Sequence, residues 1–224
     1  MIEFFNLIKS NQLTSDELVA RLKREQQNFS SIGGDYFYSL REKFNLSKCP
    51  VDFFILNRTT HSGLVRFSKK KQEFNAPYCR NDSVITDSLV RTLAERLELL
   101  KFKSQAWDWK FEVQDFQTTL KNIKGRQDVV TFLDPPYIER NPNYFTGWGE
   151  ENELSLFNLL KENNSPFILT TWVSNEKKSE INPFFKSLWA KNFKYKKNSH
   201  KYIVNGIKKD DESLKINEAI LYSK

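Results

Sequence analysis

The sequence is poor in the residues that build metal and redox sites. Its 224 residues include 2 cysteines and 2 histidines. Cys49 and Cys79 stand far apart, and neither His61 nor His200 has a partner at the spacing of metal ligands. We therefore expect no metal site, and we interpret both cysteines as reduced thiols of a cytoplasmic protein.

Long apolar runs are missing as well. No segment approaches the roughly 18 apolar residues that a membrane-spanning helix needs. The start, Met1–Phe5, contains an acidic residue and lacks the basic region that opens a signal peptide. We therefore expect no contact with a membrane.

Positive charge and aromatic residues, in contrast, are abundant. Lysine and arginine number 35 against 28 aspartates and glutamates, which gives a formal net charge of +7, and the chain carries 19 Phe, 8 Tyr and 5 Trp. This charge excess favours a polyanionic partner, above all nucleic acid. A chain of this length can bury a substantial core, as one large domain or two small ones.

The most informative motif is Asp134-Pro135-Pro136-Tyr137, which follows the apolar run 129–133. Such a run is typical of a buried strand. Proline cannot continue a sheet ladder, so the chain must leave the sheet here. The motif then lies at the carboxyl end of a strand, where open α/β sheets hold their ligands. A simple turn after a strand is the alternative interpretation.

These residue types suit the activation of an aromatic amine. The exocyclic amino group of adenine is a poor nucleophile, because its lone pair is delocalised into the ring. The Asp134 carboxylate and the Pro135 carbonyl can accept both amino hydrogens and free that lone pair, while Pro136 stiffens the backbone. Tyr137 can stack on a base that has left the duplex.

The first half of the chain has a mainly helical pattern. The sequence Thr14–Glu17 has the form of a capping box, and Gly33-Gly34 interrupts the pattern. We expect helices over residues 1–10, 14–28, 35–45, 51–60 and 87–100. Alternation from Gly63 to Asn81 around a lysine-rich tip predicts a basic β-hairpin between the last two helices.

The second half alternates strands and helices, which indicates the α/β class. We expect strands at 107–113, 129–133, 167–172, 195–204 and 216–222, and helices at 150–163 and 183–191. The last two strands, joined by a charged turn at 208–212, would form an antiparallel edge on a mostly parallel sheet.

Three segments carry a resemblance to a known family. They are 56–66 with its closing stretch 73–77, the stretch 111–116 (Phe-Glu-Val-Gln-Asp-Phe), and Asp134–Tyr137. Over nearly its whole length the chain resembles the Dam-like, or D12, class of DNA adenine-N6 methyltransferases. The resemblance implies a Rossmann-like methyltransferase sheet with an inserted, mainly helical DNA-recognition module that carries a β-hairpin.

The resemblance also implies contacts with double-stranded DNA. Arg58 matches a phosphate-contacting position, and Arg66 matches a base reader whose guanidinium fits a guanine edge. His61 and Ser62 replace an aromatic residue and an asparagine that relatives often use to fill the stack when adenine leaves it. The expected DNA-binding residues are Arg58, His61, Ser62, Leu64, Arg66, Lys70, Pro77 and Arg80. The alternative for Arg66 is an outward-pointing strand charge, and for the lysine-rich tip a solvated loop.

The resemblance assigns the cofactor, S-adenosylmethionine, to a second group of residues. Asp115 matches an acidic residue that bonds the adenine of the cofactor, Phe116 packs beside it, and Asp134 is the third expected cofactor-binding residue. The alternative for Asp115 is a cap on the following helix. The resemblance implies Asp134, Pro135, Pro136 and Tyr137 as the catalytic residues.

Two parts of the family pattern are missing. Relatives carry a Phe-x-Gly-x-Gly loop after their first strand and an acidic residue after the second, and neither precedes the recognition module in this sequence. We therefore expect the chain to be the carboxy-terminal part of the fold. Residues 1–10 would end the first part of the catalytic domain, 11–104 would form the target-recognition module, and 105–224 the catalytic core. A second chain could supply the remainder, and this chain alone should bind S-adenosylmethionine weakly.

The leading hypothesis is a site-specific adenine methyltransferase of a restriction-modification system. The alternatives are an inactive truncated fragment that only binds DNA and one chain of a split methyltransferase. Methylation of cytosine or RNA ranks low, because enzymes that act on cytosine more often carry serine in place of Asp134. A nuclease has little support, since no second carboxylate with an adjacent lysine lies near Asp134 at metal-site spacing.

Overall fold

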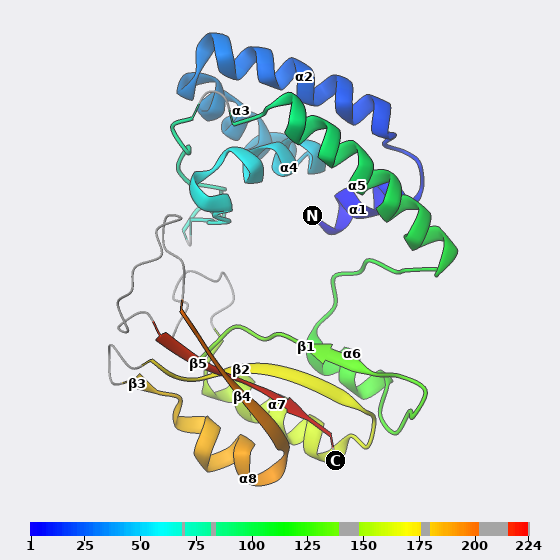
Figure 1. Cartoon of the computed structure of the whole chain (residues 1–224), viewed down its shortest axis with the longest axis vertical. Helices are drawn as coiled ribbons and strands as arrows, with labels where there is room; N and C mark the ends of the chain where they lie inside the picture. The colour runs from blue at the N-terminus through cyan, green and yellow to red at the C-terminus, as the bar shows by residue number, and fades with distance from the viewer. Residues whose placement is uncertain (69, 82–83, 139–147, 176–179, 202–214, 224) are drawn as a thin grey trace. The chain divides into compact units, whose positions relative to one another are not determined.

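The computed structural model describes residues 1–68, 70–81, 84–138, 148–175, 180–201 and 215–223. The chain folds into two compact units, Met1–Val113 and Gln114–Lys224 (Figure 1). This division follows packing and places residues 1–10 with the first unit. The assignment of functional domains to 1–10, 11–104 and 105–224 stays a prediction.

The first unit is built from helices, as the sequence predicts. The helices are α1 (Ile2–Lys9), α2 (Ser15–Ile32), α3 (Gly34–Ser47), α4 (Pro50–Thr59), the 3-10 turn η1 (His61–Gly63) and α5 (Asp87–Ala106). The capping box is confirmed, because the Thr14 side chain accepts a hydrogen bond from the backbone of Glu17. Gly33, with a φ of 68°, turns the chain between α2 and α3.

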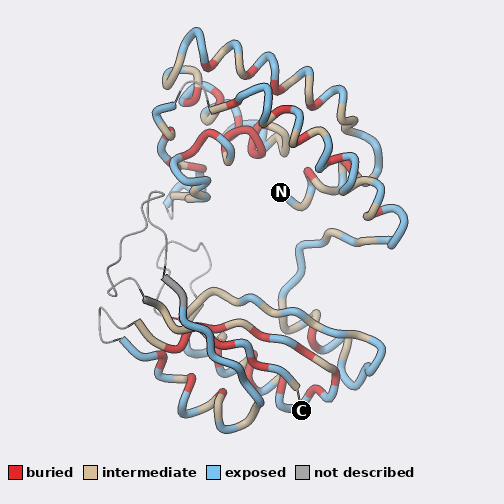
Figure 2. The backbone as a smooth tube through the Cα atoms, in the orientation of Figure 1, coloured by how far each residue is buried: buried red, intermediate tan, exposed pale blue. Residues whose placement is uncertain are grey.

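Helix α4 forms the centre of this unit, where the backbone trace is almost continuously buried (Figure 2). Its four consecutive residues Phe53–Leu56 are all buried, so both faces of the helix are covered. The Phe54 ring stacks on Phe4 of α1, with ring centroids 4.3 Å apart. The expected apolar helices at the start of the chain and at 51–60 therefore pack against each other.

A buried ionic network ties three helices of the first unit together. Arg21 of α2 lies 2.8 Å from Asp52 of α4 and 2.5 Å from Glu25. Both carboxylates are 0% exposed. Lys43 of α3 reaches the second oxygen of Asp52 at 3.1 Å, and the Tyr36 hydroxyl donates to Glu25.

The second unit is a mixed sheet with helices. Its elements are α6 (Phe116–Asn122), β1 (Thr131–Leu133), α7 (Glu150–Glu162), β2 (Phe167–Asn175), β3 (Glu180–Ile181), the π-helix η2 (Phe185–Trp189), α8 (Ala190–Asn192), β4 (Lys194–Lys201) and β5 (Lys215–Tyr222). The strand order is β1-β2-β5-β4, with β3 on β2. The α/β class is confirmed.

The expected mostly parallel sheet is wrong for the described strands. Only β1 and β2 run parallel, in a register that pairs Leu133 with Leu169. Strand β5 enters between β2 and β4 and is antiparallel to both. The sequence predicted the closing pair of strands, but it gave no sign that β5 would also lie against β2. Residues 202–214, which include the predicted charged turn, lie outside the described residues.

Helices cover one face of this sheet. The inward residues Leu169 of β2 and Leu221 of β5 are 0% exposed and pack with Phe157 and Trp189. On the opposite face, Phe132 of β1 is 65% exposed and Ile220 of β5 is 45% exposed. The sheet thus has one buried and one open face within this unit.

The predicted strand at 107–113 is wrong. The described segment after α5 makes a turn, with Asp108 at a φ of 46°. Its carbonyls are bonded by side chains of α1: Lys9 donates to the carbonyl of Trp109 at 2.7 Å and Asn6 to that of Phe111 at 3.1 Å. The alternating pattern is present, but side chains of a helix bond the backbone in place of a neighbouring strand.

The predicted helix at 183–191 is present in altered form. Residues Phe185–Trp189 make a π-helical turn, and Ala190–Asn192 continue it as a short α-helix. None of the described helices is long and apolar enough to span a membrane.

The first prediction concerns the buried ionic network. Replacing Arg21 by methionine leaves two buried carboxylates without their shared cation, which should lower the free energy of unfolding by about 3–5 kcal/mol. Urea denaturation measures this. The matched control is Lys23→Met on the exposed side of the same helix, which should stay within roughly 0.5 kcal/mol of the parent. Equal stability of the two variants would contradict the assigned role.

Candidate functional site

Asp134 stands at the first position after β1, and strand pairing gives it a partner. Because β1 pairs with β2 in parallel register, Thr170 of β2 lies next to it. The Thr170 hydroxyl donates to Asp134 Oδ1 at 2.5 Å. Asp134 is otherwise exposed, and within the described residues Thr170 is the one side chain that bonds its carboxylate. The bond orients the carboxylate and leaves Oδ2 available for a ligand.

Tyr137 reaches across the sheet to its third strand. Its hydroxyl donates to Glu218 Oε1 of β5 at 3.1 Å. Asp134 and Tyr137 therefore border one pocket on the open face of the sheet, with a volume of about 370 Å³. The pocket is lined by Phe132, Asp134, Tyr137, Thr170, Asn198, Glu218, Ala219 and Ile220.

The backbone of the tetrapeptide is fixed at its far end. Pro135 and Pro136 are half-buried, and Ile138, the next residue, is 5% exposed. The indole of Trp172, which is 2% exposed, donates to the carbonyl of Ile138 at 3.1 Å. Thr170 and Trp172, two positions apart on the same face of β2, thus hold the two ends of the motif.

Asp115 and Phe116 belong to the same unit but do not line this pocket. Asp115 caps α6 by accepting a hydrogen bond from the backbone of Gln117 at 2.9 Å, as the alternative interpretation predicts. The side chain is exposed, so its second oxygen can still face a ligand. Phe116 packs on the ring of Trp148 with centroids 5.3 Å apart. The predicted cofactor role of both residues stays a prediction.

The hairpin of the first unit is present as two antiparallel arms without regular strands in its described part. Phe67 and Phe74 form an isolated bridge, and the backbone of Ser68 donates to Glu73 at 2.8 Å. Arg66 spans the arms: its Nε donates to Asn75 Oδ1 at 2.9 Å and its terminal nitrogen to the Asn75 carbonyl at 2.7 Å. Two of its five donor hydrogens are therefore used within the hairpin.

The other predicted DNA-binding residues lie near the hairpin or at its base. His61 and Ser62 are exposed in η1, and the backbone of His61 donates to the carbonyl of Pro77 at 3.1 Å. Lys70 is exposed at the tip, and the Arg58 guanidinium lies 5.5 Å from the Phe54 ring. Leu64 is half-buried and packs on the core of the unit, while Arg80 is exposed with a φ of 57°.

Besides Asp134 and Tyr137, three polar residues line the sheet pocket, and sequence reasoning missed all three. Thr170, Asn198 and Glu218 come from β2, β4 and β5 and line it together with Asp134 and Tyr137. All three lie in segments that were predicted as strands, but only the strand order brings them to the motif. No group of three or more possible metal ligands is found among the described residues.

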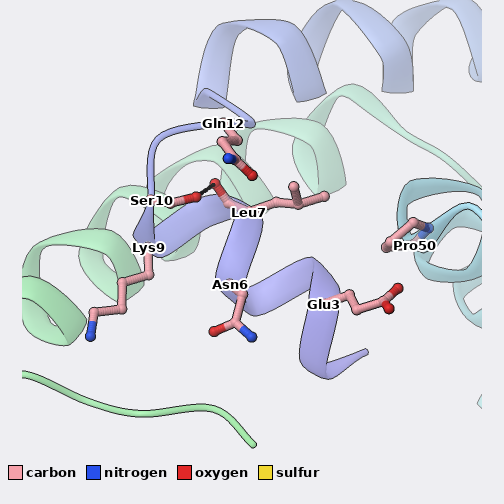
Figure 3. Close-up of a pocket in the computed structure, with 7 residues that line it drawn as sticks. All are labelled: Glu3, Asn6, Leu7, Lys9, Ser10, Gln12 and Pro50. Carbon is pink, nitrogen blue, oxygen red and sulfur yellow. Dashed lines mark hydrogen bonds between the residues drawn. The ribbon is translucent and has the colours of Figure 1, made fainter.

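A second, open groove lies along α1 in the first unit. Figure 3 shows Glu3, Asn6 and Lys9 along this helix and Pro50 opposite, at the start of α4. The groove holds none of the predicted site residues. Lys9 is already bonded to Asp108 and to the carbonyl of Trp109. We therefore place the candidate site at the sheet pocket and the hairpin.

Comparison with known proteins gives a family and two relatives. The model of the D12 class of N6 adenine-specific DNA methyltransferases matches residues 1–204. The type II methyltransferase M.FokI of Planomicrobium okeanokoites is 25% identical over 74% of this chain and 26% of its own length. A DNA adenine methylase of Serratia marcescens is 31% identical over 61% of this chain and 47% of its own length. The matched part thus spans less than half of either relative.

The second prediction concerns the brace within the hairpin. Asn75→Ala removes the side-chain acceptor of Arg66 and should weaken the local fold by about 1 kcal/mol, which corresponds to roughly fivefold faster amide exchange. The amides of Ser68 and residue 75 report this, because both donate across the arms. Amides within α5 serve as the internal control and should not change. Unaltered exchange at Ser68 would rule out the brace.

Proposed function

The chain belongs to the D12 class of N6 adenine-specific DNA methyltransferases, and we propose that it forms the base-holding and DNA-recognising part of a site-specific enzyme. That enzyme transfers the methyl group of S-adenosylmethionine to the N6 amino group of adenine in duplex DNA. The observation that carries the proposal is the placement of Asp134 and Tyr137 on one pocket at the end of β1.

Asp134 would act on the amine of the flipped base. Its free oxygen and the carbonyl of Pro135 accept the two amino hydrogens, which directs the nitrogen lone pair toward the methyl group. Thr170 holds the other carboxylate oxygen, so the acceptor is oriented before the base arrives. The proton that the amine gives up on methylation would pass to Asp134, which is exposed and can release it to solvent.

Tyr137 would hold the ring of the base. Its hydroxyl is fixed by Glu218, so the aromatic face has a defined direction at the pocket. A base that leaves the duplex loses its stacking partners, and an aromatic side chain replaces them. The pocket volume of about 370 Å³ falls in the range of small-molecule sites.

The residues around Asp115 fit the adenine end of the methyl donor. The exposed acceptor Asp115 and the neighbouring rings of Phe116 and Trp148 suit an adenine ring, which offers an amino donor and an aromatic face. S-adenosylmethionine supplies the activated methyl group when it is bound. The glycine loop from which relatives build another part of the site does not precede the recognition module in this sequence.

The first unit would read the DNA. Arg66, Lys70 and Arg58 supply cationic groups at the hairpin and its base, and Leu64, His61, Ser62, Pro77 and Arg80 flank them. The net charge of +7 adds non-specific attraction to the phosphate backbone. We further propose that the enzyme is cytoplasmic, where its DNA substrate lies, and that it serves a restriction-modification system.

A second candidate follows from the length comparison and from the sheet. The chain spans less than half of its two relatives. Strand β1 pairs on one side only within the described residues, and Val130 and Phe132 are 67% and 65% exposed there. A second polypeptide that adds a strand at this edge would pair its backbone and flank both side chains. The chain would then be one half of a split methyltransferase, and without that polypeptide it would only bind DNA.

The third prediction distinguishes an enzyme that is active as this chain alone from a split enzyme that needs a second polypeptide. Methyl transfer to unmethylated DNA is measured for the chain alone and for the chain mixed with a polypeptide that carries the Phe-x-Gly-x-Gly loop. We expect the mixture to methylate adenine, and Asp134→Ala to abolish this methylation. Parental activity of Asp134→Ala would refute the mechanism.

Thr170→Val tests the orientation of the Asp134 carboxylate. It keeps the size of the side chain but removes the hydrogen bond to the carboxylate, and should lower kcat by roughly tenfold with KM for DNA unchanged.

The fourth prediction tests DNA contact by the hairpin. Lys70→Ala should weaken binding to all DNA sequences alike and lower the slope of log affinity against log salt by about 1 if Lys70 contacts a phosphate. Arg66→Ala should reduce discrimination between sequences by about 1–3 kcal/mol if Arg66 reads a base. The control is Lys23→Ala, an exposed lysine on α2. Identical salt slopes for Lys70→Ala and the parent would exclude a phosphate contact.

A further inference from the structure

A buried carboxylate in the second unit holds two tryptophans. Glu153 lies in the first turn of α7 and is 3% exposed. Its Oε2 accepts a hydrogen bond from the indole of Trp148 and its Oε1 one from the indole of Trp189, both at 2.7 Å. Both acceptor oxygens are therefore used by indole N–H groups, which donate but cannot accept.

Burying a carboxylate in the core lowers the stability of the folded state. Burial raises the pKa of Glu153, and the two indole hydrogen bonds offset the effect only in part. An apolar side chain would fill the same place without that penalty. A carboxylate is useful here because it can hold two N–H donors at once in fixed positions.

The two indoles have different surroundings. Trp189 is 0% exposed and packs edge-on against Phe157 in the core, with centroids 5.4 Å apart. Trp148 is half-buried, and its ring lies 5.3 Å from that of Phe116. Glu153 therefore links a fully buried anchor to a half-buried tryptophan beside Phe116, the residue that follows the exposed acceptor Asp115 in the chain.

We propose that Glu153 is a positioning residue that fixes Trp148 beside Phe116, so that the two rings form an aromatic wall for the adenine ring of the methyl donor. The proposal rests on the function proposed above. It adds to that function a binding surface for the adenine ring and the residue that holds this surface in place. Trp148 contacts the adenine ring, Asp115 bonds its amino group, and Glu153 acts only through Trp148.

Variants of three residues test the support and the wall separately. Glu153→Gln keeps the shape of the side chain, but its amide group faces one indole N–H with another donor. Glu151→Gln, in the same turn and exposed, is the matched control. Trp148→Phe keeps a ring without the N–H, and Trp148→Ala removes the ring. Circular dichroism checks that each variant folds.

The first readout is the position of Trp148 in the chain alone, without ligand. In Glu153→Gln we expect displaced indole N–H signals for Trp148 and Trp189 and loss of the nuclear Overhauser contacts between Trp148 and Phe116. Glu151→Gln should leave both unchanged. Persistent Trp148–Phe116 contacts in Glu153→Gln would overturn the positioning role.

The second readout is saturation transfer from the protein to the adenine protons of S-adenosylmethionine, which suits weak binding. We expect the signal to fall at least threefold in Glu153→Gln and in Trp148→Ala, and less in Trp148→Phe. In the double variant Trp148→Phe/Glu153→Gln, the Glu153 substitution should lower the signal little further, because Trp148→Phe has already removed the hydrogen bond between the two residues. A parental signal in Trp148→Ala, or no adenine signal from the parent chain, would overturn the wall.

The experiments distinguish a failure of the Glu153 inference from a failure of the proposed methyltransferase function. If Glu153→Gln binds the adenine ring as the parent does, the inference falls, while the role of Asp134 in methyl transfer still stands. If the parent shows adenine contacts that depend on Glu153 but never methylates adenine in the mixture, the enzyme assignment falls and the aromatic wall remains. If Glu153→Gln does not fold, the two Trp148 variants decide the question of the wall.

Discussion

The parallel register between β1 and β2 is the constraint on which the candidate site depends. It sets Thr170 against Asp134 and, two residues later, Trp172 against the carbonyl of Ile138. A shift of one residue would turn both side chains to the opposite face of the sheet. The packing of Leu169 beneath the sheet opposes such a shift, because it would bring that residue out of the core. The stability of the core and the geometry of the site are thus secured by the same pairing.

Local structure could be predicted well from the sequence. The capping box at Thr14, the glycine pair at 33–34 and the proline pair after β1 each act through neighbouring residues, so their meaning does not depend on the rest of the chain. The position of Asp134 at a strand end was therefore available from residues 129–137 alone. The family was also within reach, because each of the three segments that carry the resemblance is short and continuous in the sequence.

Contacts between distant segments could not be predicted in the same way. The alternation at 107–113 is typical of a strand, but Lys9 and Asn6 of a helix about 100 residues earlier bond its carbonyls. Likewise, Glu218 reaches Tyr137 only because β5 lies beside β2 and not solely at the edge. Asp115 shows a third limit: one carboxylate can both cap a helix and face a ligand, and a pattern of residues does not distinguish the two roles.

The hydrogen bond between Trp172 and Ile138 has a consequence for engineering. It anchors the chain to the sheet directly after Tyr137, so the motif is fixed at both ends by β2. Segments of other lengths and compositions, taken from other members of the class, could be grafted beyond this anchor without displacing Asp134 or Tyr137.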